Sequence, residues 1–137
     1  MILPMMIKWG SFIFFSLAGV VHVGFFLIES ILLQKKVGQK ILGISDSQHA
    51  AVKVWALNQG FYNLFLALGT FVGLSFVVKK RVLEAGILTG FCGLSMIAAG
   101  LVLGFTSPHL RKWALLQALP PLAGLLFLYF HITGIIN

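Results

Sequence analysis

Hydrophobic positions in this chain fall into four long runs that are separated by short polar connections. The runs cover residues 10–33, 52–78, 83–104 and 111–135. A helix needs about 20 mainly apolar residues to cross the hydrocarbon core of a bilayer, so each run is long enough to span a membrane. The pattern predicts an all-α integral membrane protein, a four-helix bundle with both termini on one side.

The connections carry the signals that end one helix and begin the next. Residues 35–47 form the longest connection, in which apolar residues alternate with lysines, as is typical of a short segment on the membrane surface. At its end, Asp46 or Ser47 is predicted to cap the next helix. The second span stops at the basic residues 79–81, and the Thr-Ser-Pro sequence at 106–108 breaks the chain before the fourth.

Composition supports the same class. The chain is 59% hydrophobic and 9% charged, with a mean hydropathy of +1.02, so its natural solvent is lipid. Its 137 residues leave no room for a separate soluble domain, and we expect a single transmembrane domain over residues 1–137. The formal charge is +7, but the basic residues cluster beside apolar runs, where they would meet anionic lipid headgroups. Membrane lipid, and not nucleic acid, is the expected partner.

Two ionisable side chains stand out inside the first span. His22 and Glu29 lie in an apolar run from Phe12 to Leu33 that holds no other ionisable group. Seven residues are nearly two helical turns, which places both side chains on one face about 10 Å apart. Because a carboxyl group at bilayer depth costs at least roughly 2.5 kcal/mol, it is expected to face a partner or a polar cavity. His22 and Glu29 are therefore the candidate catalytic residues.

The second span carries a dense group of polar side chains that lipid would not tolerate. Asn58, Gln59, Tyr62 and Asn63 cover an arc of about 140° on a helical wheel, and we predict that this face looks inward and binds a ligand. The alternative to a ligand site is that these side chains only form hydrogen bonds between helices and have no further function.

The fourth span offers one more candidate ligand-binding residue. Gln117 precedes two prolines at 120–121, which lie inside the apolar run. Proline removes a backbone hydrogen bond to the preceding turn, so a kink and a widened pocket are expected near Gln117.

The third span has glycines on one narrow stripe: Gly86, Gly90, Gly93, Gly100 and Gly104. Such a stripe lets another helix approach closely. Packing inside the molecule is the preferred interpretation, and a homodimer through this stripe is the alternative.

The chemistry of these groups is general acid and base catalysis or hydrogen bonding. Glu29 or His22 can transfer protons, and the amides and the tyrosine hydroxyl can orient a polar group. One Glu and one His seven residues apart lack the close spacing of a metal site, so neither a metal nor a cofactor is implied. We predict that His22, Glu29, Asn58 and Tyr62 surround a cavity, because their hydrogen-bonding capacity exceeds what mutual pairing easily satisfies.

Several segments together resemble a known family. They are HVGFFLIES with His22 and Glu29, NQGFYNLFLALG over residues 58–69, AAGLVLGFT ending at Thr106, and QALPPLAGLL over residues 117–126. The chain is similar over nearly its whole length to small four-span bacterial membrane proteins classed as domain of unknown function thirteen-oh-four. The resemblance implies an inner-membrane, multi-pass protein and no established activity.

Three hypotheses on function follow from the sequence. The first is a site that binds or processes a small lipid-like or apolar ligand, which leaves open whether the protein is an enzyme. The second is a proton-coupled small-molecule transporter that uses Glu29. The third is a structural or interaction protein whose polar core is satisfied internally.

Overall fold

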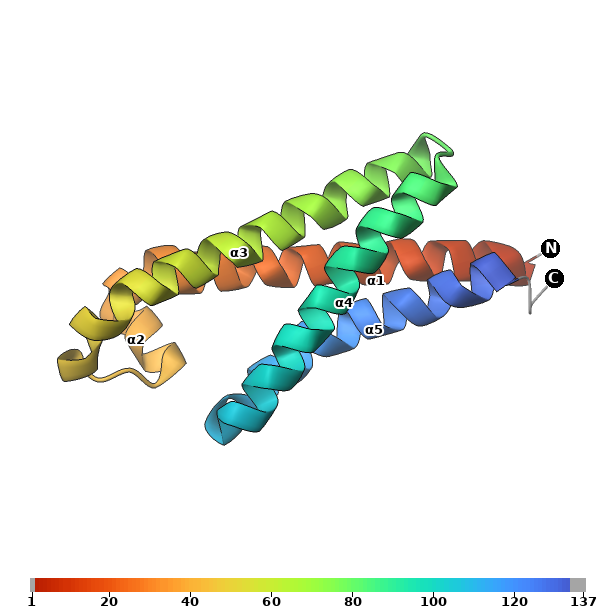
Figure 1. Ribbon diagram of the computed structural model, residues 1–137. Helices are drawn as coiled ribbons and strands as arrows, with labels where there is room; N and C mark the ends of the chain where they lie inside the picture. Colours follow the sequence, from red (N-terminus) through yellow and green to blue (C-terminus); the bar gives the residue numbers. More distant parts are fainter. Residues whose placement is uncertain (1, 134–137) are drawn as a thin grey trace.

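The computed structural model describes residues 2–133 of the chain, with the side chains of residues 9–130 and 133 (Figure 1). Within residues 2–133 every element is helical and no strand occurs. The elements are α1 (Ile2–Phe26), the π-helical turn η1 (Leu27–Ile31), the 3₁₀ turn η2 (Leu32–Gln34), α2 (Lys36–Leu42), α3 (Asp46–Val78), α4 (Val82–Thr106), the 3₁₀ turn η3 (Pro108–Leu110) and α5 (Arg111–Thr133).

Four helical segments in the described part of the chain are long and apolar enough to cross a membrane: Trp9–Gln34, Asp46–Val78, Val82–Thr106 and Pro108–Phe130. They confirm the predicted all-α class and agree with the four predicted runs. The second helix begins six residues before the predicted start at 52, and the last predicted residues, 134–135, lie outside the described residues.

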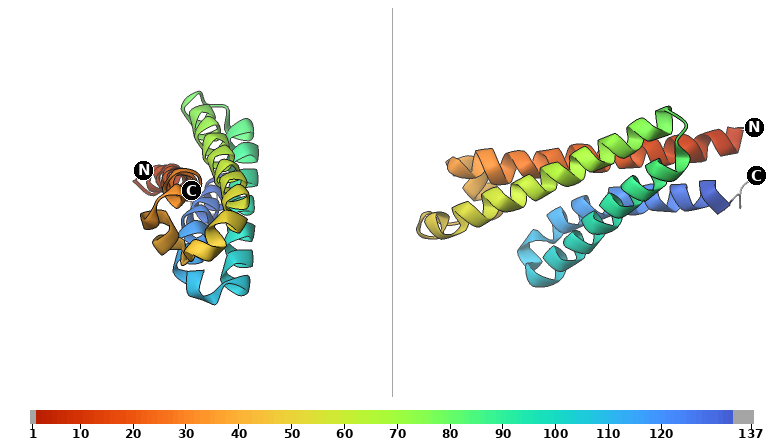
Figure 2. Two further views of the ribbon diagram at one scale, coloured as in Figure 1. Left: turned by 90° about the vertical axis from the view of Figure 1, so that its left-hand side faces the viewer. Right: turned by 45° about the horizontal axis from the view of Figure 1, so that its top comes forward.

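The long helices pack in a closed order. α1 contacts α3 and α5, and α4 contacts the same two helices from the other side. In Figure 1 and in the right-hand view of Figure 2, α4 runs obliquely to the other three long helices. As a result, the tip of the α4/α5 hairpin stands apart from the end of the molecule that carries α2. The first and last described residues lie together at the opposite end.

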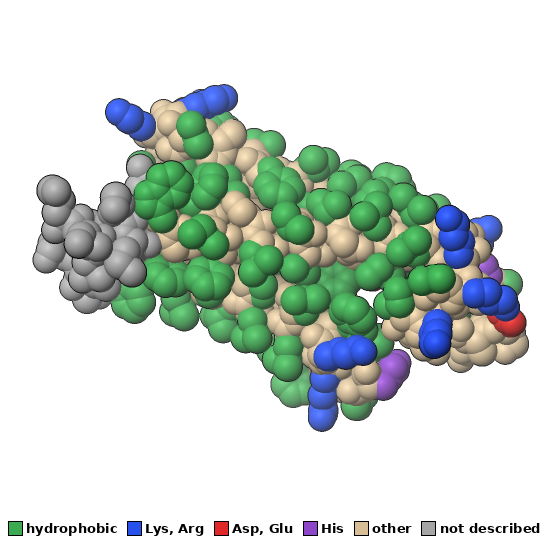
Figure 3. Space-filling model, turned by 180° about the vertical axis from the view of Figure 1, so that it is seen from behind, with side chains coloured by type: hydrophobic (Ala, Val, Ile, Leu, Met, Phe, Trp, Pro, Cys, Tyr) green, Lys and Arg blue, Asp and Glu red, His purple; other side chains and the backbone are tan. Residues whose placement is uncertain are grey.

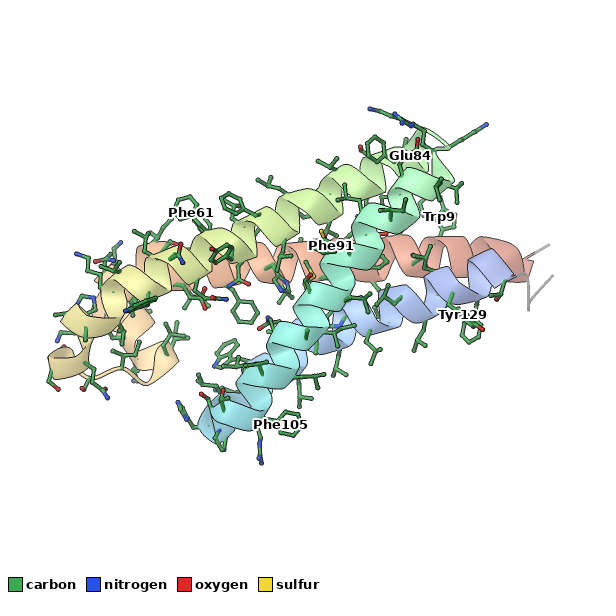
Figure 4. All side chains as sticks on the ribbon, viewed as in Figure 1. Trp9, Phe61, Glu84, Phe91, Phe105 and Tyr129 are labelled. Carbon is green, nitrogen blue, oxygen red and sulfur yellow. The ribbon has the colours of Figure 1, made fainter. Side chains whose placement is uncertain are left out.

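The surface is that of a protein surrounded by lipid. In Figure 3 hydrophobic side chains cover the length of the molecule, and Lys and Arg side chains gather at its two ends. Phe61, Phe91, Phe105 and Tyr129 project away from their helices (Figure 4), and each is at least 41% exposed. Apolar sides between charged ends suit a bilayer.

The connection between the first two spans folds as a short helix. α2 ends at Gly43, whose φ of 69° is the left-handed conformation that glycine adopts without strain. The predicted helix start is wrong by one or two residues, because Ser45 is the N-cap, not Asp46 or Ser47. Gln48 lies three residues after Ser45, and its side chain accepts a hydrogen bond of 3.1 Å from the Ser45 N–H. Because the Ser45 side chain in turn accepts from the Gln48 backbone N–H, the two residues form a capping box.

The glycine stripe of α4 divides into two parts. A Cβ added at Gly93 would lie 2.9 Å from the Phe15 ring, and one at Gly100 would lie 3.0 Å from the Ala114 carbonyl oxygen. These two glycines pack inside the molecule, which agrees with the preferred interpretation of the stripe. Gly86 and Gly90 have nothing within 4 Å of such an atom and face open space.

Candidate functional site

The first spanning helix changes its winding at the candidate acid. Glu29 lies in the π-helical turn η1, which separates α1 from η2. Single π turns within α-helices are frequent at functional sites. In this turn the Glu29 carboxyl faces α3, where Asn63 Nδ2 donates a hydrogen bond of 2.8 Å to Glu29 Oε2. The structure thus brings together two of the predicted site residues from separate spans.

Gly60 makes this contact sterically possible. A Cβ built at Gly60 would overlap Ser30 Oγ and would lie 3.3 Å from both Glu29 Cβ and the Ser30 backbone nitrogen, so a larger residue would need this turn to shift. Asn63 follows three residues later, on the same buried face of α3. The close approach at Gly60 therefore holds the amide within reach of the carboxyl. Gly60 was not among the predicted site residues, although a glycine between amides in an apolar helix is a signal of such a close approach.

A cavity of about 60 Å³, which we call the Glu29 cavity, lies beside the carboxyl. Glu29 and Gln117 contribute its polar side chains, from the first and the fourth spans. The rest of the lining is apolar or aromatic: Phe25, Ile28, Ile41, Leu42, Leu103, Leu110 and Trp113. α2 thus forms one wall, and the surface is indented between α2 and the tip of the α4/α5 hairpin (Figure 3).

Several polar groups at the cavity have unused hydrogen-bonding capacity. Gln117 is 7% exposed, and its side-chain amide has no hydrogen-bond partner within residues 9–130. Trp113 Nε1 is buried and also lacks a partner among the described residues. Pro121 follows Gln117 by four residues and has no N–H to donate to its carbonyl. A ligand here would meet both donors and acceptors.

His22 is buried next to this site but does not line the cavity. It is 0% exposed, and its Nδ1–H donates to the Ala18 carbonyl at 2.9 Å. In the neutral ring Nε2 is then an acceptor, and it finds no partner among the described residues. Its ring meets Phe25 edge to face at a centroid distance of 5.9 Å, and Phe25 meets Trp113 in the same way at 6.3 Å.

The predicted cavity lined by His22, Glu29, Asn58 and Tyr62 is wrong in its membership. Of these four residues only Glu29 lines the Glu29 cavity. For His22 and Glu29 the π turn is the physical reason, because a wheel drawn at 100° per residue fails where the winding changes. The cavity's second polar side chain is Gln117, near which a pocket was predicted.

The inward face predicted for α3 also needs correction. Asn58, Gln59 and Tyr62 are exposed, with Tyr62 at 55%, while Asn63 is 4% exposed. Buried residues of α3 follow a spacing of three and four: Gly60, Asn63, Ala67, Thr70 and Leu74. Along this narrow seam α3 packs against its neighbours. The predicted inward face, an arc of about 140°, was therefore too wide.

The length of α3 explains why exposed amides are tolerated there. Its 33 residues extend over about 50 Å, well beyond a hydrocarbon core of about 30 Å. A core that ends at Lys79 reaches back about 20 residues, to Gln59. Asn58 and Gln59 then lie at the headgroup boundary, and Asn63 lies one turn inside it. For a core placed in this way, the Glu29 cavity lies just beneath the lipid headgroups on the α2 side.

The site consists of hydrogen-bonding groups around one carboxyl. Within the described residues no group of three or more His, Cys, Asp or Glu side chains is placed to hold a metal ion. An ionised carboxyl accepts hydrogen bonds and a protonated one also donates, so Glu29 can bind or exchange a proton with a polar group in the cavity.

The fold and surface define a multi-pass membrane protein with four long apolar helices. Within that class, the chain belongs to the family described as Protein of unknown function (DUF1304), whose model matches residues 16–129. This confirms the resemblance, and the match covers Glu29, Asn63 and Gln117. The comparisons with curated proteins and with solved structures gave no match.

Proposed function

We propose that this protein, in a bacterial inner membrane, binds a small lipid-like molecule whose polar group enters the Glu29 cavity. The observation that carries the proposal is the cavity itself, in which Glu29 and Gln117 from different spans face one space beside Trp113 Nε1, a buried donor without a partner among the described residues. Ligand sites commonly combine mainly apolar walls with a few polar groups that fix orientation.

The groups in the cavity favour a particular kind of ligand. Glu29 and Gln117 supply acceptors, while Gln117 and Trp113 supply donors. A hydroxyl, amide or amine satisfies such a set, whereas a second carboxylate would meet Glu29 with like charge. A volume of about 60 Å³ admits only a small polar group. The apolar body of the ligand would then extend toward the surrounding lipid.

The position of the cavity supports entry from the membrane. It lies about one helical turn beneath the headgroup boundary, where an amphipathic molecule already holds its polar end. Ile41 and Leu42 of α2 form part of the wall, so a molecule would enter beside α2 without crossing the packed core.

The test is a headgroup series on one alkyl chain. Purified full-length protein in detergent is titrated with decanol, decylamine and decanoate, and the midpoint of thermal unfolding is followed. Decanol and decylamine should raise the midpoint, because they donate to Glu29, and decanoate should have less effect. Glu29→Gln should remove the preference for decylamine, and Gln117→Leu should weaken binding of decanol.

The matched control is Glu84→Gln. Glu84 pairs with Arg81 at the surface and does not line the cavity, so its replacement should leave the series unchanged. The Glu29→Gln protein should fold, because a glutamine oxygen still accepts the bond from Asn63. Equal shifts with all three probes, or the same series in Glu29→Gln, would overturn the proposal and leave a structural role as the better explanation.

A further inference from the structure

A second hollow lies at the other end of the molecule, beside the connection between α3 and α4. Two cavities of about 200 and about 280 Å³ share Phe12, Val77 and Lys80 in their linings, and for that reason we treat them as one groove. We call it the terminal groove. Its walls are almost entirely apolar and come from α1, α3, α4 and α5, with Phe15, Leu74 and Leu128 among them. An apolar groove of this shape on a lipid-facing surface suits a hydrocarbon chain.

Lys80, at the mouth of this groove, has an unusual backbone conformation. Its φ is 60°, and among the described residues no other non-glycine residue has a positive φ. Lys80 N–H bonds to the Val77 carbonyl at 3.1 Å, and Arg81 N–H bonds to the Phe76 carbonyl at 2.9 Å. These two bonds form a Schellman motif, in which the left-handed position is normally glycine. A lysine is therefore kept where glycine would be less strained.

Lys79 and Arg81, the neighbours of Lys80, both have side-chain contacts within the molecule. Arg81 pairs with Glu84 and lies 5.0 Å from the Phe76 ring, and Lys79 also lies over that ring, at 6.0 Å. The whole chain has three acidic residues. Glu84 is bound to Arg81, Asp46 to Lys36, and Glu29 to Asn63 on the opposite side. No acidic side chain is thus left to pair with Lys80.

We propose that the terminal groove binds an anionic phospholipid, with its phosphate at Lys80 and one acyl chain along the apolar walls. An unpaired cation at the mouth of an apolar groove complements this ligand in both of its parts. Trp9 also lines the groove, and tryptophan is enriched at the membrane interface where the phosphate lies.

The first test separates the headgroup from the chains. Full-length protein in detergent is titrated by native mass spectrometry with dioleoyl phosphatidylglycerol and dioleoyl phosphatidylcholine, which share their acyl chains. The anionic lipid should bind more tightly. Lys80→Asn, which tolerates the left-handed conformation, should weaken its binding roughly fivefold and weaken binding of the zwitterionic lipid less, because the choline already offsets that lipid's phosphate charge. Lys53→Gln, at an exposed position near the start of α3, should have no such effect.

The second test fills the groove. Gly86 lines it and Gly90 does not, although both have nothing within 4 Å of an added Cβ. Gly86→Leu should reduce binding of both lipids because it occupies the space of the acyl chain. Gly90→Leu makes the same change one turn further along and should leave binding intact.

A third variant tests the left-handed conformation of Lys80 and the preference for anionic lipid together. Lys80→Gly should raise the thermal midpoint without lipid by on the order of 3 °C, since glycine relieves the left-handed strain. The same variant should lose the preference for the anionic lipid. A preference that survives in both Lys80→Asn and Lys80→Gly, or binding that is unaffected by Gly86→Leu, would overturn the proposal.

Discussion

At the scale of single residues, the contact between Glu29 and Asn63 organises the site. The Glu29 carboxyl lies within a spanning segment, and the structure satisfies it with one amide from the neighbouring helix, at 2.8 Å. Gly60 provides the space for this contact, because any side chain there would meet Ser30. The Glu29 carboxyl can accept further hydrogen bonds, and Glu29 lines the cavity. A polar contact therefore positions the acid at the edge of the cavity.

Removal of the amide should destabilise the protein. Asn63→Leu keeps a similar volume but leaves the Glu29 carboxyl without its donor, and we expect a loss of about 1–3 kcal/mol in the free energy of unfolding. Denaturation in mixed micelles measures it. Asn58→Leu is the matched control on the same helix, at an exposed position, and should change stability by less than about 0.5 kcal/mol. Equal effects of the two changes would contradict the role of Asn63.

At the scale of elements, departures from a regular helix create the site. The π turn η1 turns Glu29 toward α3, and Pro121 in α5 removes a backbone hydrogen bond next to Gln117. α4 contributes close packing, through Gly93 against Phe15 and Gly100 against the backbone of α5. Glycine is used in α4 where two helices touch, and an irregular turn or proline is used where the cavity opens.

Bulky residues in α4 should separate these roles. Gly100→Leu should reduce the fraction of protein that elutes as a single folded species in size-exclusion chromatography, because the new side chain would clash with the Ala114 carbonyl and Ala118 of α5. Gly90→Leu has open space and should elute like the unmodified protein. If both variants behaved alike, the packing of α4 against α5 would differ from that described.

At the scale of the whole molecule, the oblique path of α4 places two hollows at opposite ends. The Glu29 cavity lies on the side of α2 and the α4/α5 hairpin tip, and the terminal groove lies on the side of the termini and Lys80. Basic residues gather at both ends (Figure 3). A homodimer through the glycine stripe stays a prediction, and in the monomer only Gly86 and Gly90 of that stripe remain open for it.

The arrangement predicts the sidedness of the connections. In a Cys92→Ala background, which removes the single native cysteine, Ser47→Cys and Ser107→Cys should react with a membrane-impermeant thiol reagent from the same side of sealed vesicles. Lys79→Cys should react only from the opposite side, because α3 and α4 each cross the membrane once. Labelling of all three positions from one side would refute the four-span arrangement.

The sequence alone determined the class and the helical spans, and it pointed to polar side chains that the candidate site contains. Runs of about 20 apolar residues are a one-dimensional signal, because the thickness of the bilayer fixes the length of helix that it requires. Glu29, Asn63 and Gln117 were found in the same way, since polar groups in such runs are costly. The family match agrees with that interpretation.

Only the tertiary structure decided which of these side chains meet. The π turn changed the direction of Glu29, and the seam through Gly60 and Asn63 turned Asn58, Gln59 and Tyr62 outward. Trp113 joined the site because α5 packs against α1, which brings the indole to the Phe25 ring and to the cavity. Such contacts depend on local winding and on how closely two helices approach. Both depend on steric fit between residues far apart in the chain, which a periodic pattern within one helix does not contain.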